Sequence, residues 1–286
     1  MSKKHPVIAI TGSSGAGTST VKGAFHHIFG RLKVEPIIIE GDSFHRYDRE
    51  EMKRVMAKEE AKGNKYFSHF GPDANHFDEI EKTFKAYGEK GLCQRRYYLH
   101  NEEEAEPFGQ NPGEFTPWEE VGEGSDLLFY EGLHGGVECG DIDVSKYVDL
   151  LIGVVPVVNL EWIQKIHRDK EKRGYSAEAT VDTIHRRMWD YINYITPQFS
   201  KTDINFQRVP TVDTSNPFIA RDIPTLDESF VVVRFKDHKF CDFLNLQSMI
   251  TGSFMSRPNT LVVPGGKMGF VMELILREQI AKMLDR

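Results

Sequence analysis

Short apolar runs rich in Val, Ile and Leu recur along the chain and are separated by longer, more polar segments. Continuous apolar runs of this length are typical of strands that are buried on both faces of a parallel sheet. The runs predict six strands, at Pro6–Ile10, Pro36–Ile39, Ser125–Glu131, Val148–Val155, Phe230–Phe235 and Thr260–Val263.

The segments between these runs carry apolar residues at helical spacing. Residues 21–29 predict a helix directly after the first strand, because their apolar positions recur every three or four residues. Ser176 has a side chain suited to an N-cap and predicts a helix start there. Further helical segments are expected at 49–62, 78–88, 159–194 with a break at Gly174, and 270–285.

Strands that alternate with helices in this way predict an α/β fold with a parallel sheet. The sequence shows no internal repeat and no long linker. We therefore expect residues 1–286 to form a single domain with insertions.

Composition and charge exclude several classes of protein. The net charge of −7 argues against a general nucleic-acid binder, and 40% hydrophobic with 28% charged residues argues against a disordered chain. Three cysteines without a CxxC pair disfavour a secreted disulfide scaffold and a zinc cluster. The first apolar run is too short for a signal peptide and no run is long enough to span a membrane, so we expect a soluble, cytoplasmic protein.

A glycine-rich loop follows the first predicted strand. Gly12-x4-Gly17-Thr18-Ser19 matches the phosphate-binding pattern G-x-x-x-x-G-K-[ST] everywhere except at Thr18, which stands in place of lysine. Backbone N–H groups of such a loop converge on phosphate oxygens, and Ser19 stands where a hydroxyl would ligate Mg²⁺. Either the loop is not catalytic or another cation replaces the lysine. The expected nucleotide-binding residues are Gly12, Ser13, Ser14, Gly15, Ala16, Gly17, Thr18, Ser19 and Thr20.

Two carboxylates stand at the ends of predicted strands. Asp42 follows the second strand, where a carboxylate can accept the proton of an attacking hydroxyl. Glu131 ends the third strand, as in the arrangement that orients Mg²⁺ in P-loop proteins. The segments 45–49 and 95–100 combine arginine, tyrosine and histidine, and they suggest anion-binding sites for a phosphorylated acceptor.

A basic cluster at 165–173 could supply the missing cation. Lys165, Arg168 and Asp169 are spaced i, i+3 and i+4 and therefore share one helical face. Arg173 stands just before Gly174. A charged helix beside a glycine break suggests a lid that closes over the transferred phosphate.

Several of these segments together resemble the phosphoribulokinases of the bacterial type. The resemblance rests on GSSGAGTS from Gly12, EGDSFHRYDRE from Glu40, LLFYEGLHGG from Leu127, KIHRDKEKRG from Lys165 and PGGKMGFVMELI from Pro264. It implies a fold like that of the P-loop nucleotide monophosphate kinases, with a mixed, mostly parallel sheet between helices. It also implies transfer of the γ-phosphoryl of MgATP to the 1-hydroxyl of ribulose 5-phosphate in the Calvin cycle.

The resemblance also implies roles for individual residues. Asp42 matches the catalytic base and Glu131 a second acid that touches Mg²⁺. Lys165 and Arg168 match residues that stabilise the phosphoryl charge, and Asp169 a metal-binding or lid acid. The residues that match the sugar-phosphate site are His45, Arg49, Arg173 and, more weakly, His100.

Regulation and assembly are implied in the same way. Bacterial relatives of this type are octamers that NADH activates, as an effector and not as a redox cofactor, and that AMP inhibits. Arg31, Arg234 and Arg257 are the candidate effector-binding residues because both effectors are anionic. Two alternatives stay open: a uridine- or pantothenate-type kinase, which shares the loop and the strand-end aspartate, and a non-catalytic nucleotide sensor, which would explain the missing lysine.

Overall fold

The computed structural model describes residues 4–12 and 18–285, without the side chains of Thr18, Ser19, Lys172 and Arg173. The chain divides into two compact units, and neither is continuous in sequence. Unit 1 comprises Met1–Ile10, Glu35–Asp149 and His185–Ser200, and unit 2 comprises Thr11–Val34, Leu150–Ile184 and Lys201–Arg286. The single domain expected over 1–286 stays a prediction.

Eight strands of the described chain form one sheet in the order β11-β12-β10-β9-β8-β1-β5-β2. Two of its pairings are parallel, β2 with β5 and β8 with β9. Three are antiparallel, β9 with β10, β10 with β12, and β12 with β11. This mixed sheet with flanking helices confirms the predicted α/β fold.

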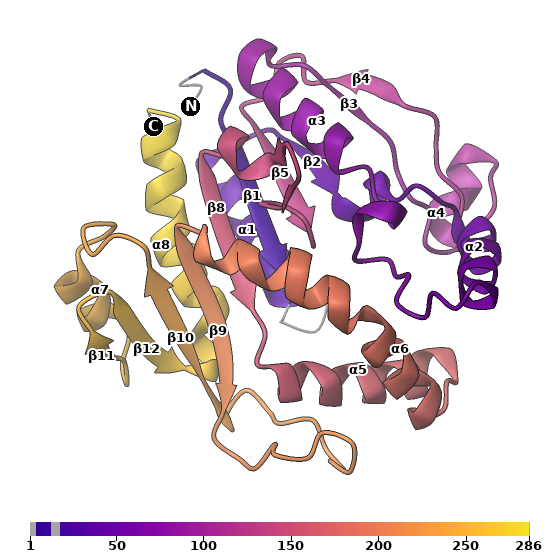
Figure 1. Ribbon diagram of the computed structural model, residues 1–286. Coiled ribbons are helices and arrows are strands. Elements are labelled where there is room, and N and C mark those ends of the chain that lie inside the picture. Colours follow the sequence, from indigo (N-terminus) through magenta and orange to yellow (C-terminus); the bar gives the residue numbers. More distant parts are fainter. Residues whose placement is uncertain (1–3, 13–17, 286) are drawn as a thin grey trace. The chain divides into compact units, whose positions relative to one another are not determined.

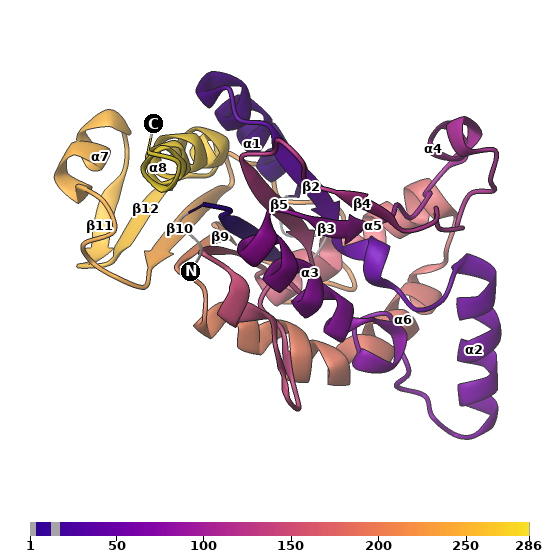
Figure 2. The same ribbon diagram turned by 90° about the horizontal axis from the view of Figure 1, so that it is seen from above.

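Unit 1 is built on β1 (Val7–Gly12, of which residues 7–10 belong to this unit), β2 (Pro36–Glu40) and β5 (Leu127–Gly132). Large aromatic side chains fill its core, among them the fully buried Phe44, Phe77, Phe84, Tyr87 and Tyr130. Figures 1 and 2 both show α2 and α4 away from β2 and β5. The other elements of the unit are α2 (Arg49–Ala61), α3 (Phe77–Lys90), β3 (Cys93–Arg95), α4 (Glu102–Ala105), β4 (Glu119–Val121), β6 (Glu138–Cys139) and β7 (Ile142–Asp143).

Unit 2 holds α1 (Thr18–Leu32), β8 (Leu150–Val155), α5 (Val158–Arg173) and the first part of α6 (Ala177–Asp190). α5 ends where Gly174 adopts a left-handed backbone with φ of 68°. α6 begins after Ser176, whose hydroxyl accepts a hydrogen bond from the Ala179 amide, as the sequence predicts. The remaining elements are β9 (Ile204–Pro210), β10 (Ser229–Phe235), α7 (Phe243–Met249), β11 (Phe254–Arg257), β12 (Thr260–Pro264) and α8 (Met268–Met283).

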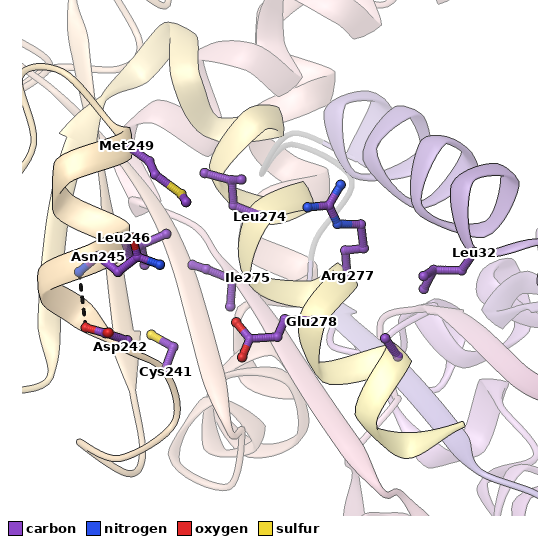
Figure 3. A pocket seen from close by; sticks show the side chains of 11 residues that line it. Leu32, Cys241, Asp242, Asn245, Leu246, Met249, Leu274, Ile275, Arg277 and Glu278 are labelled. Atoms are coloured by element: carbon purple, nitrogen blue, oxygen red, sulfur yellow. Dashed lines mark hydrogen bonds between the residues drawn. The ribbon is translucent and has the colours of Figure 1, made fainter. Parts of the chain in front are cut away.

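A pocket of about 270 Å³ opens in unit 2 between α7 and α8, with Leu32 of α1 at its margin (Figure 3). Its walls are largely apolar, but Asp242 and Glu278 place carboxylates beside the Cys241 thiol. Burial raises the pKa of Cys241 to about 12, so this thiol is protonated at neutral pH. Asp242 caps α7 by accepting a hydrogen bond of 3.1 Å from the Asn245 amide.

Candidate active site

The turn after β2 places Asp42 beside the end of β5. Glu40 and Glu131 are partners in the parallel register, so the two strands end at the same level. The chain then turns through a short 3₁₀ helix, Gly41–Phe44. A Cβ on Gly41 would lie 2.7 Å from the Tyr130 hydroxyl oxygen and 2.9 Å from the Gly132 Cα, so only glycine fits here.

Two histidines flank the Asp42 carboxylate. His45 Nε2 lies 3.7 Å from Oδ1, and His100 Nε2 lies 3.7 Å from Oδ2. Burial lowers the pKa of His45, against an opposing effect of Asp42, so this imidazole is neutral at pH 7. The Asp42 side chain is 45% exposed and therefore accessible to a substrate hydroxyl. An accessible carboxylate between two imidazoles can accept a proton.

Arg49 connects this site to the loop that carries His100. Asp48 caps α2 by accepting a hydrogen bond of 2.7 Å from the Glu51 amide, which places Arg49 in the first turn. The Arg49 guanidinium donates to the His100 carbonyl at 2.8 Å. The structure thus brings four predicted site residues together in unit 1: Asp42, His45, Arg49 and His100.

Glu131 places a carboxylate at the end of β5, where the sequence predicts an Mg²⁺ ligand. Its side chain is half-buried at the end of β5, and its charge contributes to the raised pKa of the buried Tyr130 hydroxyl. Proteins usually hold Mg²⁺ through one or two carboxylates together with substrate phosphates, so Glu131 fits this role. Within residues 4–12 and 18–285, no three His, Cys, Asp or Glu side chains gather as a protein-only metal site.

The cluster on α5 forms as its spacing predicts. Lys165 Nζ lies 2.5 Å from Asp169 Oδ2, and Arg168 Nε lies 3.3 Å from Asp169 Oδ1. Asp169 is 2% exposed and Lys165 is 12% exposed, so this is a largely buried ion cluster rather than a solvated helix face. Lys165 is held by Asp169 in this arrangement. Arg173 is the last residue of α5, and its side chain lies outside the described residues.

The phosphate-loop prediction is tested only at its ends. Gly12 closes β1, where a Cβ would lie 2.6 Å from the Val154 carbonyl oxygen, so the loop must start with glycine. Residues Thr18, Ser19 and Thr20 form the first turn of α1, so the predicted strand before the glycine-rich segment and the helix after it are confirmed. The loop residues Ser13, Ser14, Gly15, Ala16 and Gly17, and the side chains of Thr18 and Ser19, lie outside the described residues.

The three candidate effector arginines lie on separate elements of unit 2. Arg31 on α1 is bound to Glu273 of α8 at 3.0 Å. Arg234 on β10 and Arg257 on β11 are both exposed and both pair in register with Thr260 of β12. Thr260 is therefore the register partner of both arginines, although the register of β11 shifts between Met255 and Arg257.

Other residues near Asp42 were not singled out from the sequence. The rings of His69 and Tyr98 lie 5.4 and 6.0 Å from the His45 ring, and the charge of Arg187 helps to lower the His45 pKa. Arg95 and Arg96, in the stretch expected to bind an anion, instead bind protein atoms. The basic and aromatic composition of 95–100 is the signal for this neighbourhood, but composition alone does not say what each side chain contacts.

The close approach of β5 to the Asp42 turn gives a first testable prediction. A Cβ on Gly132 would lie 2.6 Å from the Tyr130 hydroxyl oxygen and 2.7 Å from the Gly41 Cα. Gly132→Ala is therefore expected to cost about 1–3 kcal/mol of unfolding free energy through overpacking. Because the displaced turn carries Asp42, kcat/KM should fall as well. The control is Gly23→Ala in α1, where a Cβ meets nothing within 4 Å. Wild-type stability and activity in Gly132→Ala would refute the close approach.

A buried histidine predicts acid sensitivity. Burial lowers the pKa of His134 to about 4 from 6.5, and its Nε2 binds the Phe70 carbonyl at 2.9 Å. The unfolded state binds the proton first as pH falls, so stability is complete above pH ~6.5 and is lost towards pH ~4. The full effect is about 3 kcal/mol. In urea unfolding at pH 7.5 and 5, His134→Gln should lose less stability on acidification than wild type, and an unchanged loss would contradict this assignment.

These features define a class of protein. A mixed sheet whose first strand precedes a glycine-rich sequence, with carboxylates at the ends of two neighbouring parallel strands, is the arrangement of P-loop kinases and related phosphotransferases. Residues 7–215 match the family described as "Phosphoribulokinase / Uridine kinase family". The chain belongs to this family.

Similar proteins agree with the assignment. The chain is 60% identical over 286 residues to the chromosomal phosphoribulokinase of Cupriavidus necator, covering 100% of this chain and 98% of that protein. It is 58% identical to the phosphoribulokinase of Nitrobacter vulgaris, covering 100% and 99%. The solved phosphoribulokinase of Rhodobacter spheroides has a TM-score of 0.91, 53% identity and 99% coverage of both chains.

Two expectations from the sequence are thereby confirmed: the resemblance to phosphoribulokinases and the assignment of the chain as a kinase. Among the residues that the structure describes, the helices are too short or too polar to cross a membrane.

Proposed function

We propose that the chain transfers the γ-phosphoryl group of MgATP to the 1-hydroxyl of D-ribulose 5-phosphate, giving ribulose 1,5-bisphosphate and ADP. The reaction would supply the CO₂ acceptor of the Calvin cycle. The observation that carries the proposal is the accessible Asp42 carboxylate, placed at the end of β2 between two imidazoles. The names of the full-length relatives support the same substrate.

Asp42 acts as the general base. The hydroxyl proton at O1 passes to an Asp42 oxygen while O1 forms a bond to the γ-phosphorus and the bond to the ADP oxygen breaks. Arginine and imidazole groups hold the 5-phosphate of the acceptor. Arginine suits this task because its planar donors match phosphate oxygens. The residues assigned to the sugar phosphate are His45, Arg49, His100 and Arg173.

Phosphoryl transfer requires positioning and charge stabilisation more than covalent chemistry. Residues 12–20 bind the nucleotide phosphates through loop amides and the start of α1. Lys165 and Arg168 stabilise charge on the transferred group, with Lys165 in place of the loop lysine that Thr18 lacks. Ser19, Glu131 and Asp169 are the residues that would hold Mg²⁺, which when bound neutralises charge on the phosphate oxygens.

A substrate panel tests the proposal. ADP release from MgATP is measured by a coupled assay with ribulose 5-phosphate, uridine or pantothenate as acceptor. We expect ADP release with ribulose 5-phosphate as acceptor and none with uridine or pantothenate. Release with uridine or pantothenate instead would keep the kinase and overturn the acceptor. Nucleotide binding without acceptor-dependent release would favour a nucleotide sensor.

The same proposal extends to assembly and regulation. We propose a cytoplasmic homo-octamer that NADH activates and AMP inhibits, with Arg31, Arg234 and Arg257 in the effector site. The support is the placement of Arg234 and Arg257 on either side of Thr260, where two exposed guanidinium groups suit an anionic ligand. Neither effector enters the chemistry of phosphoryl transfer.

Removing either exposed arginine should weaken activation without changing the basal rate. In Arg234→Ala and Arg257→Ala, we expect the NADH concentration for half-maximal activation to rise by about 10-fold or more, because a charge-assisted hydrogen bond is lost. Lys282→Ala is the control, since Lys282 is an exposed cation of the same unit that pairs with Glu278. The measurement is ADP release against NADH concentration. Wild-type activation in both arginine variants would remove them from the effector site.

A further inference from the structure

Arg96 binds the turn that carries Asp42. Its Nε donates to the Ser43 carbonyl at 2.7 Å and its Nη2 donates to the His45 carbonyl at 2.7 Å. The two carbonyls belong to the residue after Asp42 and to the histidine that flanks the Asp42 carboxylate. One side chain thus fixes the backbone on the C-terminal side of Asp42, across more than 50 residues of sequence.

Aromatic rings hold the Arg96 guanidinium in place. The guanidinium carbon lies 3.8 Å from the centre of the Phe115 ring and 4.6 Å from the centre of the Trp118 ring. Trp118 also contacts Phe44, in the middle of the turn, with ring centres 5.8 Å apart. Burial lowers the pKa of Arg96 to about 10, which leaves the group charged at neutral pH. The guanidinium is therefore a charged, oriented donor to the turn.

Lysine could not make the same set of contacts. The planar guanidinium offers donors in a fixed geometry and stacks on aromatic rings, whereas an ammonium group is a point charge on a flexible stem. The two bonds to Ser43 and His45 use separate nitrogens of one rigid plane. Both features would be lost in Arg96→Lys, although the charge would be kept.

The preceding residue provides a natural contrast. Arg95 pairs with Glu119 at 2.8 Å across the antiparallel β3–β4 pair and lies 4.8 Å from the centre of the Tyr97 ring. These contacts with Glu119 and Tyr97 lie within the β3–β4 region and do not involve the turn after β2. The two adjacent arginines thus have the same charge and similar aromatic contacts, but only Arg96 is bonded to the backbone beside Asp42.

We propose that Arg96 is a positioning residue for phosphoryl transfer. It holds the 41–45 turn in the conformation that directs the Asp42 carboxylate and the His45 imidazole towards the acceptor. This inference rests on the proposed function, in which Asp42 is the base. Arg96 itself takes no proton and binds no phosphate. Because small misplacements of a reacting group lower rates steeply, its loss should reduce kcat even in a folded protein.

The test compares matched variants of the two arginines in the full chain. Arg96→Lys and Arg96→Ala are expected to lower kcat with ribulose 5-phosphate by at least about 10-fold and to leave the KM for ATP within about two-fold of wild type. Arg95→Lys and Arg95→Ala should keep wild-type kcat. An effect of Arg96→Lys confined to the KM for ribulose 5-phosphate would make Arg96 a binding cation and overturn the proposal.

Chemical rescue separates positioning from a general role in stability. Propylguanidinium added to Arg96→Ala should restore part of the lost kcat, because it can occupy the space between Phe115 and Trp118. Propylammonium at the same concentration should not. If the alanine variant does not fold, Arg96→Lys still decides the question through its kcat and its thermal unfolding midpoint. A wild-type kcat in a folded Arg96→Lys would overturn the proposal.

A double-mutant cycle tests whether Arg96 acts through Asp42. Arg96→Lys should lower kcat far less in an Asp42→Asn background than in the wild type, because the displaced carboxylate is then already absent. Equal losses in the two backgrounds would contradict the proposal. Failure of the proposed function gives a different result: Asp42→Asn alone would then keep near-normal turnover, whatever the Arg96 variants do.

Discussion

Asp42→Asn is expected to lower kcat with ribulose 5-phosphate by about 10²–10⁴-fold, the usual contribution of a general base. Asparagine keeps the size of the side chain, and its amide can remain near His45 and His100, but it cannot accept the hydroxyl proton. The KM for ATP should stay near its wild-type value, because Asp42 acts on the acceptor. Steady-state ADP release with each substrate varied in turn makes the measurement.

Asp48→Asn is the matched control for this substitution. Asp48 caps α2 in the same stretch of chain, and asparagine is an equally good N-cap, so stability and activity should both be retained. If Asp48→Asn lowers kcat as much as Asp42→Asn does, the loss would reflect a general effect of an Asp-to-Asn change in this segment and not the loss of the base. Near-normal turnover in Asp42→Asn would remove Asp42 as the base.

Lys165→Met should lower kcat by about 10²–10³-fold, as expected when one preorganised donor to a developing charge is removed. The reason is that Thr18 leaves the phosphate loop without its lysine, and Lys165 is proposed to supply that charge. The effect on kcat should exceed the effect on either KM. If only the Michaelis constants change, Lys165 does not replace the loop lysine.

The same substitution should also destabilise the protein. Asp169 is 2% exposed and would lose its partner at 2.5 Å, whereas its contact of 3.3 Å with Arg168 would remain. Removing one member of a buried ion pair costs about 3 kcal/mol of unfolding free energy. Lys146→Met is the control, because Lys146 is exposed and lies 3.8 Å from Asp143. Denaturant unfolding of both variants separates lost stability from lost catalysis, provided that kcat is measured where each variant is folded.

The strands that position the site could be predicted because each is a continuous apolar run. β1, β2, β5 and β8 are nearly fully apolar and are bounded by glycine or by charged residues, so their existence and ends are local properties of the sequence. The prediction that Asp42 and Glu131 belong to the site follows directly from their positions at the ends of β2 and β5. Their proximity follows from the parallel pairing of β2 with β5, in which Glu40 lies opposite Glu131.

β9 was not predicted, although its sequence carries a signal. Ile204 and Phe206 are buried and alternate with Asn205 and Gln207, which is the pattern of a strand with one polar face. A run of this kind is short, and its pairing with β8 on one side and β10 on the other is set by contacts far apart in sequence. β10 and β12 were predicted from their apolar runs, but the pairing of β9 with its neighbours could not be read from local patterns.

The contacts of charged side chains were the least predictable part of the site. Spacing on a helix placed Lys165 and Asp169 together correctly, because the i, i+4 geometry is local. Arg95 and Arg96 are neighbours of identical charge, yet one pairs with Glu119 and the other binds the turn beside Asp42. Arg95 ends β3 and Arg96 follows it, so the difference depends on which way each side chain points and on what packs there, and neither property is visible in the sequence.

The most direct test of the central claim is to identify the product. The protein is incubated with MgATP and ribulose 5-phosphate, and the phosphorus NMR spectrum is followed until ATP is consumed. We expect equal amounts of ADP and of a bisphosphate with a new phosphomonoester at carbon 1, and almost no inorganic phosphate. ADP formed with an equal amount of inorganic phosphate, or a phosphate placed on another hydroxyl, would contradict transfer to O1 with Asp42 as the base.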